Sequence, residues 1–206
     1  GDEANLTFAD TTGGIAGLTI NADGSFMFDT SDAAYEDLDT GDISTINVTY
    51  SVTDPNSDEG NGAFDIVITG TNDAPVATFT TPQTVAEDAA AITDTLTATD
   101  ADAGDVLTFT LDAVTDGLTL AGAVWTFDPS DAAYQSLAIG ESQIITVNYT
   151  VTDSQNATDQ ESFEITVTGA NDAPVATFNT QQDVNEGSGM APGQLTATDI
   201  DTGDEA

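Results

Sequence analysis

The sequence predicts an all-β protein, built from antiparallel β-sandwich repeats that follow one another in an extended rod. Three observations lead to this prediction. Apolar and polar residues alternate along many short segments, as they do in strands that bury one face. The same segments return after about 99 residues. With 39% hydrophobic residues, the chain of 206 residues is also apolar enough to form a core, unlike most chains that are this acidic.

The repeat is defined by four anchors that recur in the same order. TGTNDAPVATF at 69–79 returns as TGANDAPVATF at 168–178, and the step from Asn72 to Asn171 gives an offset of 171 − 72 = 99. The other anchors are the SDAAY segments at 31–35 and 130–134, the runs that end at Asp54 and Asp153, and the LTATD segments at 96–100 and 195–199. Four anchors spread over the whole period exclude coincidence and indicate a tandem array.

The repeat also sets the expected domain boundaries. We expect a sandwich repeat that lacks its first strands, then one complete repeat, then the opening strands of a third. These parts are residues 1–71, 76–170 and 175–206, joined by linkers at 72–75 and 171–174. Because a lone pair of strands is marginal in water, residues 175–206 are expected either to pair with residues 1–71 of a neighbouring molecule, giving homopolymer contacts, or to be disordered.

Within a repeat, the strands follow from patterns with a period of two. Apolar positions from Ile145 to Val151 alternate with Thr and Asn, and the run from Ile46 to Val52 does the same one repeat earlier. Roughly seven such strands in about 100 residues are typical of an antiparallel sandwich. The SDAAY segments are expected to be connectors that pack on the core, with a single helical turn capped by Ser31 or Ser130 as the alternative. Trp125, which matches Phe26 of the first repeat, is expected in the core.

The charge excludes many functions. The chain has 37 Asp and Glu and no Lys, Arg or His, so its formal net charge of −37 has no internal counter-cation. Without His, Lys or Cys it lacks the nucleophiles and soft metal ligands of most catalytic sites. Nucleic acid and anionic membrane surfaces would be repelled, and no segment is long and apolar enough for membrane insertion. Carboxylates, amides and carbonyls remain, and these are the ligands of Ca²⁺.

Acidic residues gather where strands are expected to end. DADAGD places Asp100, Asp102 and Asp105 around a Gly, and the motif recurs as DIDTGD with Asp199 and Asp201. Alternate carboxylates of an extended segment face the same way, and the Gly allows a turn that brings further oxygens around an ion. Asp and Gly are ordinary turn residues, so the motif gains weight only from its pairing with NDAP in every repeat.

The order and spacing of these motifs resemble a known family. TGTNDAPVA, LTATDADAGDVLTFTL, SDAAYQSLAIGES and NYTVTD are similar to the cadherin-like VCBS repeats of giant RTX-type bacterial adhesins. The resemblance covers the whole chain and implies Ig/cadherin-like Greek-key sandwiches. Animal cadherins have a related DxNDNAP linker, but Gly70 and Gly169 stand where its first Asp would be. The number of ions per linker therefore stays open.

The resemblance implies Ca²⁺ at each junction, held by the upper repeat, the linker and the lower repeat. At the first junction the implied ligands are Asp42, Asn72, Asp73, Asp100, Asp102 and Asp153. At the second junction they are Glu87, Glu141, Asn171, Asp172, Asp199 and Asp201. Asp42 stands at the position of the Glu in the cadherin LDxE motif, and Glu87 at the position of the Glu in the cadherin PE motif.

These observations predict a calcium-rigidified extender of a long extracellular adhesin or filament, on the surface of a Gram-negative bacterium, with neighbouring repeats as partners. An alternative is that the repeat face binds carbohydrate or protein. A halophile surface protein would instead scatter its acids evenly. We expect no enzyme: the DTG triplets at 39–41 and 201–203 match an aspartic protease motif, but 201 − 39 = 162 is not a multiple of the repeat.

Overall fold

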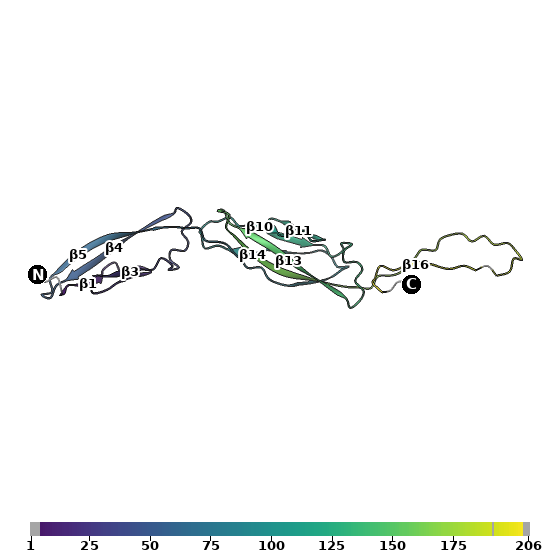
Figure 1. Cartoon of the computed structure of the whole chain (residues 1–206), viewed down its shortest axis with the longest axis horizontal. Helices are drawn as coiled ribbons and strands as arrows, with labels where there is room; N and C mark the ends of the chain where they lie inside the picture. Colours follow the sequence, from purple (N-terminus) through teal and green to yellow (C-terminus); the bar gives the residue numbers. More distant parts are fainter. Residues whose placement is uncertain (1–4, 191, 204–206) are drawn as a thin grey trace. The chain divides into compact units, whose positions relative to one another are not determined.

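The computed structural model describes residues 5–190 and 192–203, and these residues form sixteen β-strands and no α-helix. The predicted all-β class is confirmed. The chain divides into two compact units (Figure 1). Unit 1 contains the residues up to Val76 together with two loops of the following repeat, Thr99–Leu107 and Thr152–Thr158, and unit 2 contains the remainder.

The complete repeat is a sandwich of two sheets. One sheet has the order β10-β13-β14-β7, and the other has the order β11-β12-β8. The strands of the first are β7 (Gln83–Ala86), β10 (Thr108–Leu111), β13 (Ser142–Thr152) and β14 (Thr158–Thr168). Those of the second are β8 (Ile92–Thr95), β11 (Leu118–Ala121) and β12 (Val124–Phe127), and β6 (Val76–Ala77) pairs separately with β9 (Ala98–Thr99).

One strand pair departs from the expected antiparallel arrangement. β7 runs parallel to β14, with Val85 opposite Val167 and Ala86 opposite Thr168. Parallel strands cannot be joined by a tight hairpin, and here the chain visits the other sheet between β7 and β14. The opening strand of the repeat therefore closes the edge that β14 would otherwise leave free.

The core of the complete repeat is aromatic. Trp125 and Phe163 have ring centroids 5.1 Å apart, and Phe79 packs edge-on against Phe163 at the same distance. The Tyr149 hydroxyl donates to the Phe79 carbonyl and accepts from the Phe79 N–H, both at 3.1 Å. Since these residues come from β12, β13, β14 and the segment after β6, they tie the opening strands to both sheets. The predicted core position of Trp125 is confirmed.

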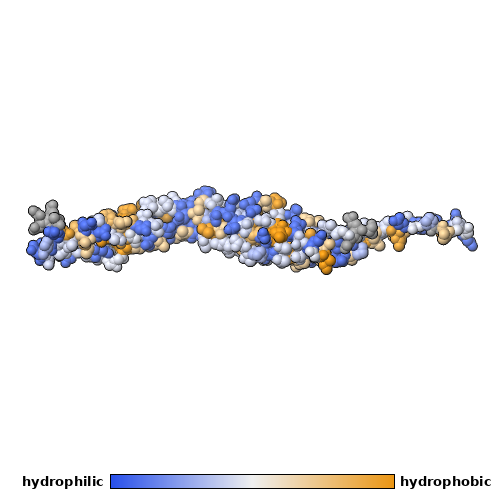
Figure 2. Space-filling model, turned by 60° about the horizontal axis from the view of Figure 1, so that its bottom comes forward, coloured by the Kyte–Doolittle hydropathy of each residue, from blue (hydrophilic) through white to orange (hydrophobic). Residues whose placement is uncertain are grey.

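The first repeat has the same central strands but a more open core. β1 (Thr7–Asp10), β4 (Ile43–Thr53) and β5 (Glu59–Thr69) form one sheet, and β2 (Leu18–Ile20) and β3 (Phe26–Phe28) form a hairpin. Within the part of the chain that the structure describes, β5 is an edge strand. Phe26 is 52% exposed, whereas its counterpart Trp125 is 0% exposed. Apolar patches are visible among polar surface in the space-filling view (Figure 2).

The opening of the third repeat contains one short strand pair. β15 (Val175–Ala176) pairs with β16 (Ala197–Thr198), and no further strand lies between them in 177–190 or 192–196. Val184, Met190 and Leu195 in this segment are exposed. The segment has the sequence of an opening strand but no sheet to pair with among the described residues.

The SDAAY segment at 130–134 is a connector with Tyr134 buried, as expected, and the alternative of a capped helical turn is wrong. Asp128 accepts hydrogen bonds from both the N–H and the hydroxyl of Ser130, so the serine donates instead of capping a helix. Successive turns follow, the first closed by the Tyr134 N–H and the Asp131 carbonyl at 3.0 Å. Asp side chains that bond the backbone two residues ahead compete with helix formation, which explains the difference.

Candidate metal centres

A first acidic cluster lies in unit 1, in the loops that follow β9 and β13. Each of Asp100, Asp105 and Asp153 offers one carboxylate oxygen, and the three oxygens lie within 4.8 Å of one another. Asp153 is held by the turn it begins, because its Oδ1 accepts from the N–H groups of Gln155 at 2.9 Å and Ala157 at 2.8 Å. The loops thus direct three formal negative charges to one place.

The first linker joins this cluster through two hydrogen bonds. The Asn72 side-chain amide donates to Asp153 Oδ2 at 2.9 Å, and the Asp73 N–H donates to Asp102 Oδ2 at 2.7 Å. Asp102 in turn donates its own N–H to Asp100 Oδ1 at 3.0 Å. The linker and the DADAGD motif, which are far apart in sequence, therefore form one connected group.

Several acceptor atoms of this group are buried without a donor. Among the described residues, the side-chain oxygens in this state are Asn72 Oδ1, Asp100 Oδ2, Asp102 Oδ1, Asp105 Oδ2 and Gln155 Oε1. A buried acceptor without a partner costs free energy, and a buried carboxylate costs more. Because the chain contains no Lys, Arg or His, no side chain of its own can neutralise these atoms. A cation from outside fits them.

The pKa values of Asp102 and Asp153 reflect the burial of these carboxylates and the hydrogen bonds that they accept. Burial raises the pKa of Asp102 above its usual value, against the lowering effect of the Asp73 N–H, and the charges of Asp39, Asp73 and Asp100 raise it further. Burial also acts to raise the pKa of Asp153, but the Asn72 amide and the Ala157 and Gln155 N–H groups hold it below its usual value. The hydrogen bonds to Asp153 therefore favour its charged form, whereas burial and the neighbouring charges disfavour the charged form of Asp102.

A second acidic cluster lies in unit 2 and consists of Glu87, Asp172 and Asp201, with one oxygen of each within 4.8 Å of the others. Glu87 is fully buried directly after β7, where its Oε1 accepts from the Ala170 N–H at 2.7 Å and its Oε2 from the Leu137 N–H at 3.4 Å. Burial and the charges of Asp88, Asp201 and Asp199 raise the pKa of Asp172.

The two clusters are partial views of one repeated arrangement. Asp172 donates its N–H to Asp201 Oδ2 at 2.8 Å, as Asp73 does to Asp102 one repeat earlier. Asp201 Oδ1 is buried without a donor, as is Asp102 Oδ1. The first cluster shows the carboxylates of the lower repeat, and the second shows the buried Glu of the upper repeat.

The structure brings most of the predicted ligands together. Asp100 and Asp153 belong to the first cluster, and hydrogen bonds join Asn72, Asp73 and Asp102 to it. Glu87, Asp172 and Asp201 form the second cluster. Asp199 lies beside the second, since its Oδ1 accepts the Asp201 N–H at 3.1 Å. Asn171 is exposed and donates to the Asp172 carbonyl.

Asp42 and Glu141 lie outside both groups of converging carboxylates. Both are exposed, and Glu141 accepts the Ala138 N–H at 3.1 Å within its own turn. Their expected role as ligands stays a prediction.

Two acidic residues, one in the first cluster and one beside it, were not among the predicted ligands. Asp105 belongs to DADAGD, but the prediction used only the first two carboxylates of that motif. Asp39 accepts a hydrogen bond from the Gln155 side chain, and its charge raises the pKa of Asp102. Ala138 occupies the equivalent position one repeat later, so the repeat did not reveal Asp39. The adjacent Leu38, as in the LDxE motif, was the available signal.

Comparisons with known proteins agree with the fold. Residues 72–166 match the family model described as bacterial Ig domain. The human CDH23 EC21-23 structure is similar with a TM-score of 0.57 and 16% identity, over 98% of this chain and 72% of that one. Mouse cadherin-23 EC22-24 is similar with a TM-score of 0.51 and 16% identity, over 95% and 65%. No curated protein matches the chain.

The class that fold and comparisons define is a tandem Ig/cadherin-like β-sandwich protein. Its two clusters offer only oxygen ligands, since the chain contains neither His nor Cys. Carboxylate and amide oxygens suit Ca²⁺, which takes six to eight of them, and do not suit zinc or copper. In the part of the chain that the structure describes, no helix is long and apolar enough to span a membrane.

Proposed function

We propose that this chain is a calcium-rigidified extender segment of a long extracellular adhesin or surface filament, with Ca²⁺ bound at the junctions between repeats. One observation carries the proposal: five buried oxygens of the first cluster have no donor, in a chain that has no cationic side chain. The match of residues 72–166 to a bacterial Ig domain and the likeness to cadherin repeats support a tandem-repeat role.

The mechanism follows from electrostatics. Asp73 belongs to the linker, whereas Asp100, Asp102 and Asp153 belong to loops of the next repeat, so an ion bound to them would join the linker to that repeat. Without the ion these carboxylates repel one another, and their burial increases the cost. Binding would replace that repulsion by coordination and thereby stiffen the junction and stabilise the folded loops.

A complete junction would have room for more than one ion. The second cluster places a buried Glu of the upper repeat beside the linker Asp and the second Asp of the DxD motif. The first cluster places three further carboxylates, of Asp100, Asp105 and Asp153, at the lower repeat. Since these two groups have no repeat position in common, we assign them to two neighbouring positions of one site.

The likeness of the motifs to VCBS repeats of RTX-type adhesins favours the surface of a Gram-negative bacterium as the setting. There the segment would project a distal binding domain away from the cell. Neighbouring repeats of the same array would be its principal partners.

The test is a calcium titration of the chain, with thermal melting and small-angle scattering at fixed ionic strength, against Mg²⁺ and EDTA. We expect Ca²⁺ to raise the melting temperature and the maximum dimension, and Asp102→Asn with Asp201→Asn to abolish both effects. Asp58→Asn is the matched control, because Asp58 is exposed in the turn after β4 and outside both clusters. Equal responses to Ca²⁺ and Mg²⁺ in the parent chain would overturn the calcium mechanism.

A further inference from the structure

The two repeats differ in charge in the turns that follow SDAAY. Residues 36–39 read Glu-Asp-Leu-Asp in the first repeat, and residues 135–138 read Gln-Ser-Leu-Ala in the second. The surrounding sequence is otherwise alike, since SDAAY precedes both segments, and a Gly and an acidic residue follow both after one further residue. Segment 36–39 therefore carries three carboxylates at positions where segment 135–138 carries none.

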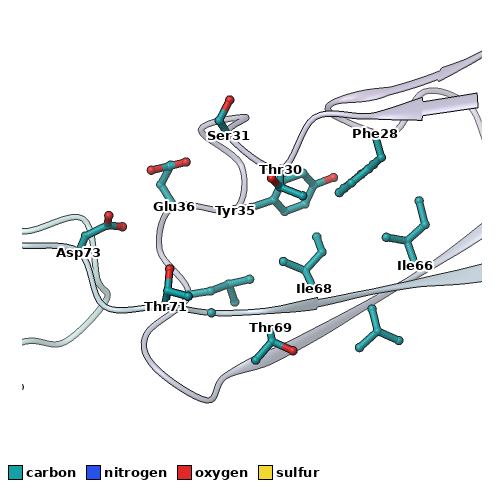
Figure 3. Close-up of a pocket in the computed structure, with 13 residues that line it drawn as sticks. Phe28, Thr30, Ser31, Tyr35, Glu36, Ile66, Ile68, Thr69, Thr71 and Asp73 are labelled. Carbon is teal, nitrogen blue, oxygen red and sulfur yellow. The ribbon is translucent and has the colours of Figure 1, made fainter.

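Segment 36–39 lies beside the first acidic cluster, and both belong to unit 1. Asp39 accepts a hydrogen bond from the Gln155 side chain, whose own oxygen is buried without a donor. Asp39 also acts on Asp102, because its charge raises the pKa of that buried carboxyl. Figure 3 shows Glu36 and the linker Asp73 at the same end of the group of residues drawn. Segment 36–39 thus adds negative charge beside carboxylates that already converge.

Each segment also contacts the DxD loop, which is the loop that holds Asp100 and Asp102 or, one repeat later, Asp199 and Asp201.

These contacts differ between the two junctions. At the first, the Asp37 carbonyl accepts the Ala103 N–H at 3.4 Å. At the second, the Ser136 carbonyl accepts both the N–H of Thr202 at 3.1 Å and its hydroxyl at 2.7 Å. Asp37 and Ser136 are counterparts at the repeat offset, and so are Ala103 and Thr202. One long hydrogen bond at the first junction is therefore replaced by two shorter ones at the second.

The difference in charge and the difference in hydrogen bonds act in the same direction. Without a cation, Asp39 repels Asp102, and the single long bond of Ala103 opposes that repulsion only weakly. With Ca²⁺ bound, the same carboxylates attract the ion instead. Segment 135–138 has no charge to repel the DxD loop or to attract an ion. The bonds between Thr202 and the Ser136 carbonyl join neutral groups and need no cation.

We propose that the two junctions respond differently to calcium. At the first, the contact between segment 36–39 and the DxD loop requires bound Ca²⁺, whereas at the second the hydrogen bonds of Thr202 hold the corresponding contact without it. The second cluster still binds Ca²⁺, but this contact does not depend on the ion. Withdrawal of Ca²⁺ would therefore release the first contact and leave the second. This inference rests on the calcium role proposed above.

In an array, junctions of the two kinds would divide the rod into calcium-controlled bending points and points that stay stiff. The sequence of four residues after SDAAY, together with the residue that follows the second Asp of the DxD motif, would set the kind of each junction.

Amide hydrogen exchange measured by NMR tests this difference, because the N–H groups of Ala103 and Thr202 report the two contacts directly. The chain is compared in Ca²⁺ and in EDTA at fixed ionic strength, and its melting temperature is recorded in both. We expect Ca²⁺ to slow the exchange of Ala103 at least tenfold and that of Thr202 less than about threefold, with Thr202 already protected in EDTA.

The repeat supplies matched variants, because each position has its counterpart one repeat away. Ala103 and Thr202 are both exposed, so neither exchange disturbs the core. Ala103→Thr should slow exchange at position 103 in EDTA roughly fivefold, which is the contribution of one ordinary hydrogen bond. Thr202→Ala should make protection at position 202 depend on Ca²⁺.

The charge is tested in the same way. Asp39→Ala, which copies position 138, should raise the Ca²⁺ concentration at which Ala103 becomes protected by roughly tenfold, as is typical for groups close to a bound metal. Asp58→Asn, outside both clusters, is the control and should leave that concentration unchanged.

The outcomes separate this inference from the calcium role. Equal slowing at Ala103 and Thr202, or a Thr202 N–H without protection in EDTA, would overturn the difference between the junctions even if Ca²⁺ raises the melting temperature. No effect of Ala103→Thr in EDTA would overturn the part assigned to the hydrogen bonds, and no effect of Asp39→Ala the part assigned to the charge. A chain in which Ca²⁺ changes neither exchange nor melting temperature would refute the calcium role itself, and this inference with it.

Discussion

The first and second repeats contain the same central strands, but the second buries the aromatic residues of these strands more completely. Val147, Tyr149 and Phe163 are buried in β13 and β14, whereas Tyr50 and Phe64, the counterparts of the last two, are half-buried in β4 and β5. The difference is the segment 76–98, which supplies Phe79, Val85 and Leu96 to the second core. The opening strands are thus an essential layer of this sandwich.

The largest effect is expected from a substitution in the core of the complete repeat. Phe163 touches the rings of Phe79, Trp125 and Tyr149, so Phe163→Ala should lower the free energy of unfolding by about 3–5 kcal/mol. Phe64→Ala, at the equivalent half-buried position, should cost about 1–2 kcal/mol, because less area is lost. Denaturant unfolding followed by circular dichroism measures both, and equal losses would contradict the difference between the repeats.

The second expected effect concerns the loop after the long central strand. Asp153 and Asp54 make the same turn, each accepting from the N–H groups two and four residues ahead. Only Asp153 converges with other carboxylates among the described residues. Asp153→Asn should therefore weaken Ca²⁺ binding at least tenfold, about 1.4 kcal/mol, whereas Asp54→Asn should leave it unchanged. Calorimetric titration measures the Ca²⁺ affinity of both variants. Equal losses of affinity would show that Asp153 is not a ligand.

The third prediction concerns a substitution that removes a single side-chain oxygen. The Tyr149 hydroxyl bonds both backbone groups of Phe79, so Tyr149→Phe leaves a buried N–H and a buried carbonyl without that partner. We expect a loss of about 1–3 kcal/mol. Tyr50→Phe should have almost no effect in a monomeric chain, since no described group bonds that hydroxyl. A clear loss from Tyr50→Phe would mean that the Tyr50 hydroxyl has a hydrogen-bond partner in solution.

Much of this could be predicted from sequence, for identifiable reasons. The alternation from Ile145 to Val151 located β13, because a half-buried strand imposes a period of two. The repeat offset placed Asp73 and Asp102 in the same relation as Asp172 and Asp201, which their matching hydrogen bonds confirm.

Other features depend on contacts between distant segments, and a one-dimensional pattern does not contain them. Glu87 and Glu141 are both acids near strand ends, but only Glu87 is buried, because β7 carries it against β14 and the Ala170 N–H. Asp39 was missed because its role depends on contact with Gln155, 116 residues away. The parallel pairing of β7 depends likewise on the path of the chain through the other sheet.

The smallest expected effect concerns a feature that the repeats share. Asp29 and Asp128 each accept the hydroxyl and the N–H of the serine two residues ahead, and these bonds, the hydroxyl first, lower the pKa of both carboxyls. A lowered pKa stabilises the fold above the unfolded value, near 3.9, and this contribution is lost as the pH falls through the folded value. Carbon-detected NMR titration of the side-chain carboxyls measures both.

Ser31→Ala and Ser130→Ala should raise the pKa of their own aspartate toward the usual value, and by similar amounts, because both pairs are exposed and local. Unlike the three preceding changes, this one should not distinguish an open core from a closed one. A larger rise at Asp128 than at Asp29 would mean that the opening strands act beyond the groups they touch, and that the difference between the repeats extends to the turns of the surface.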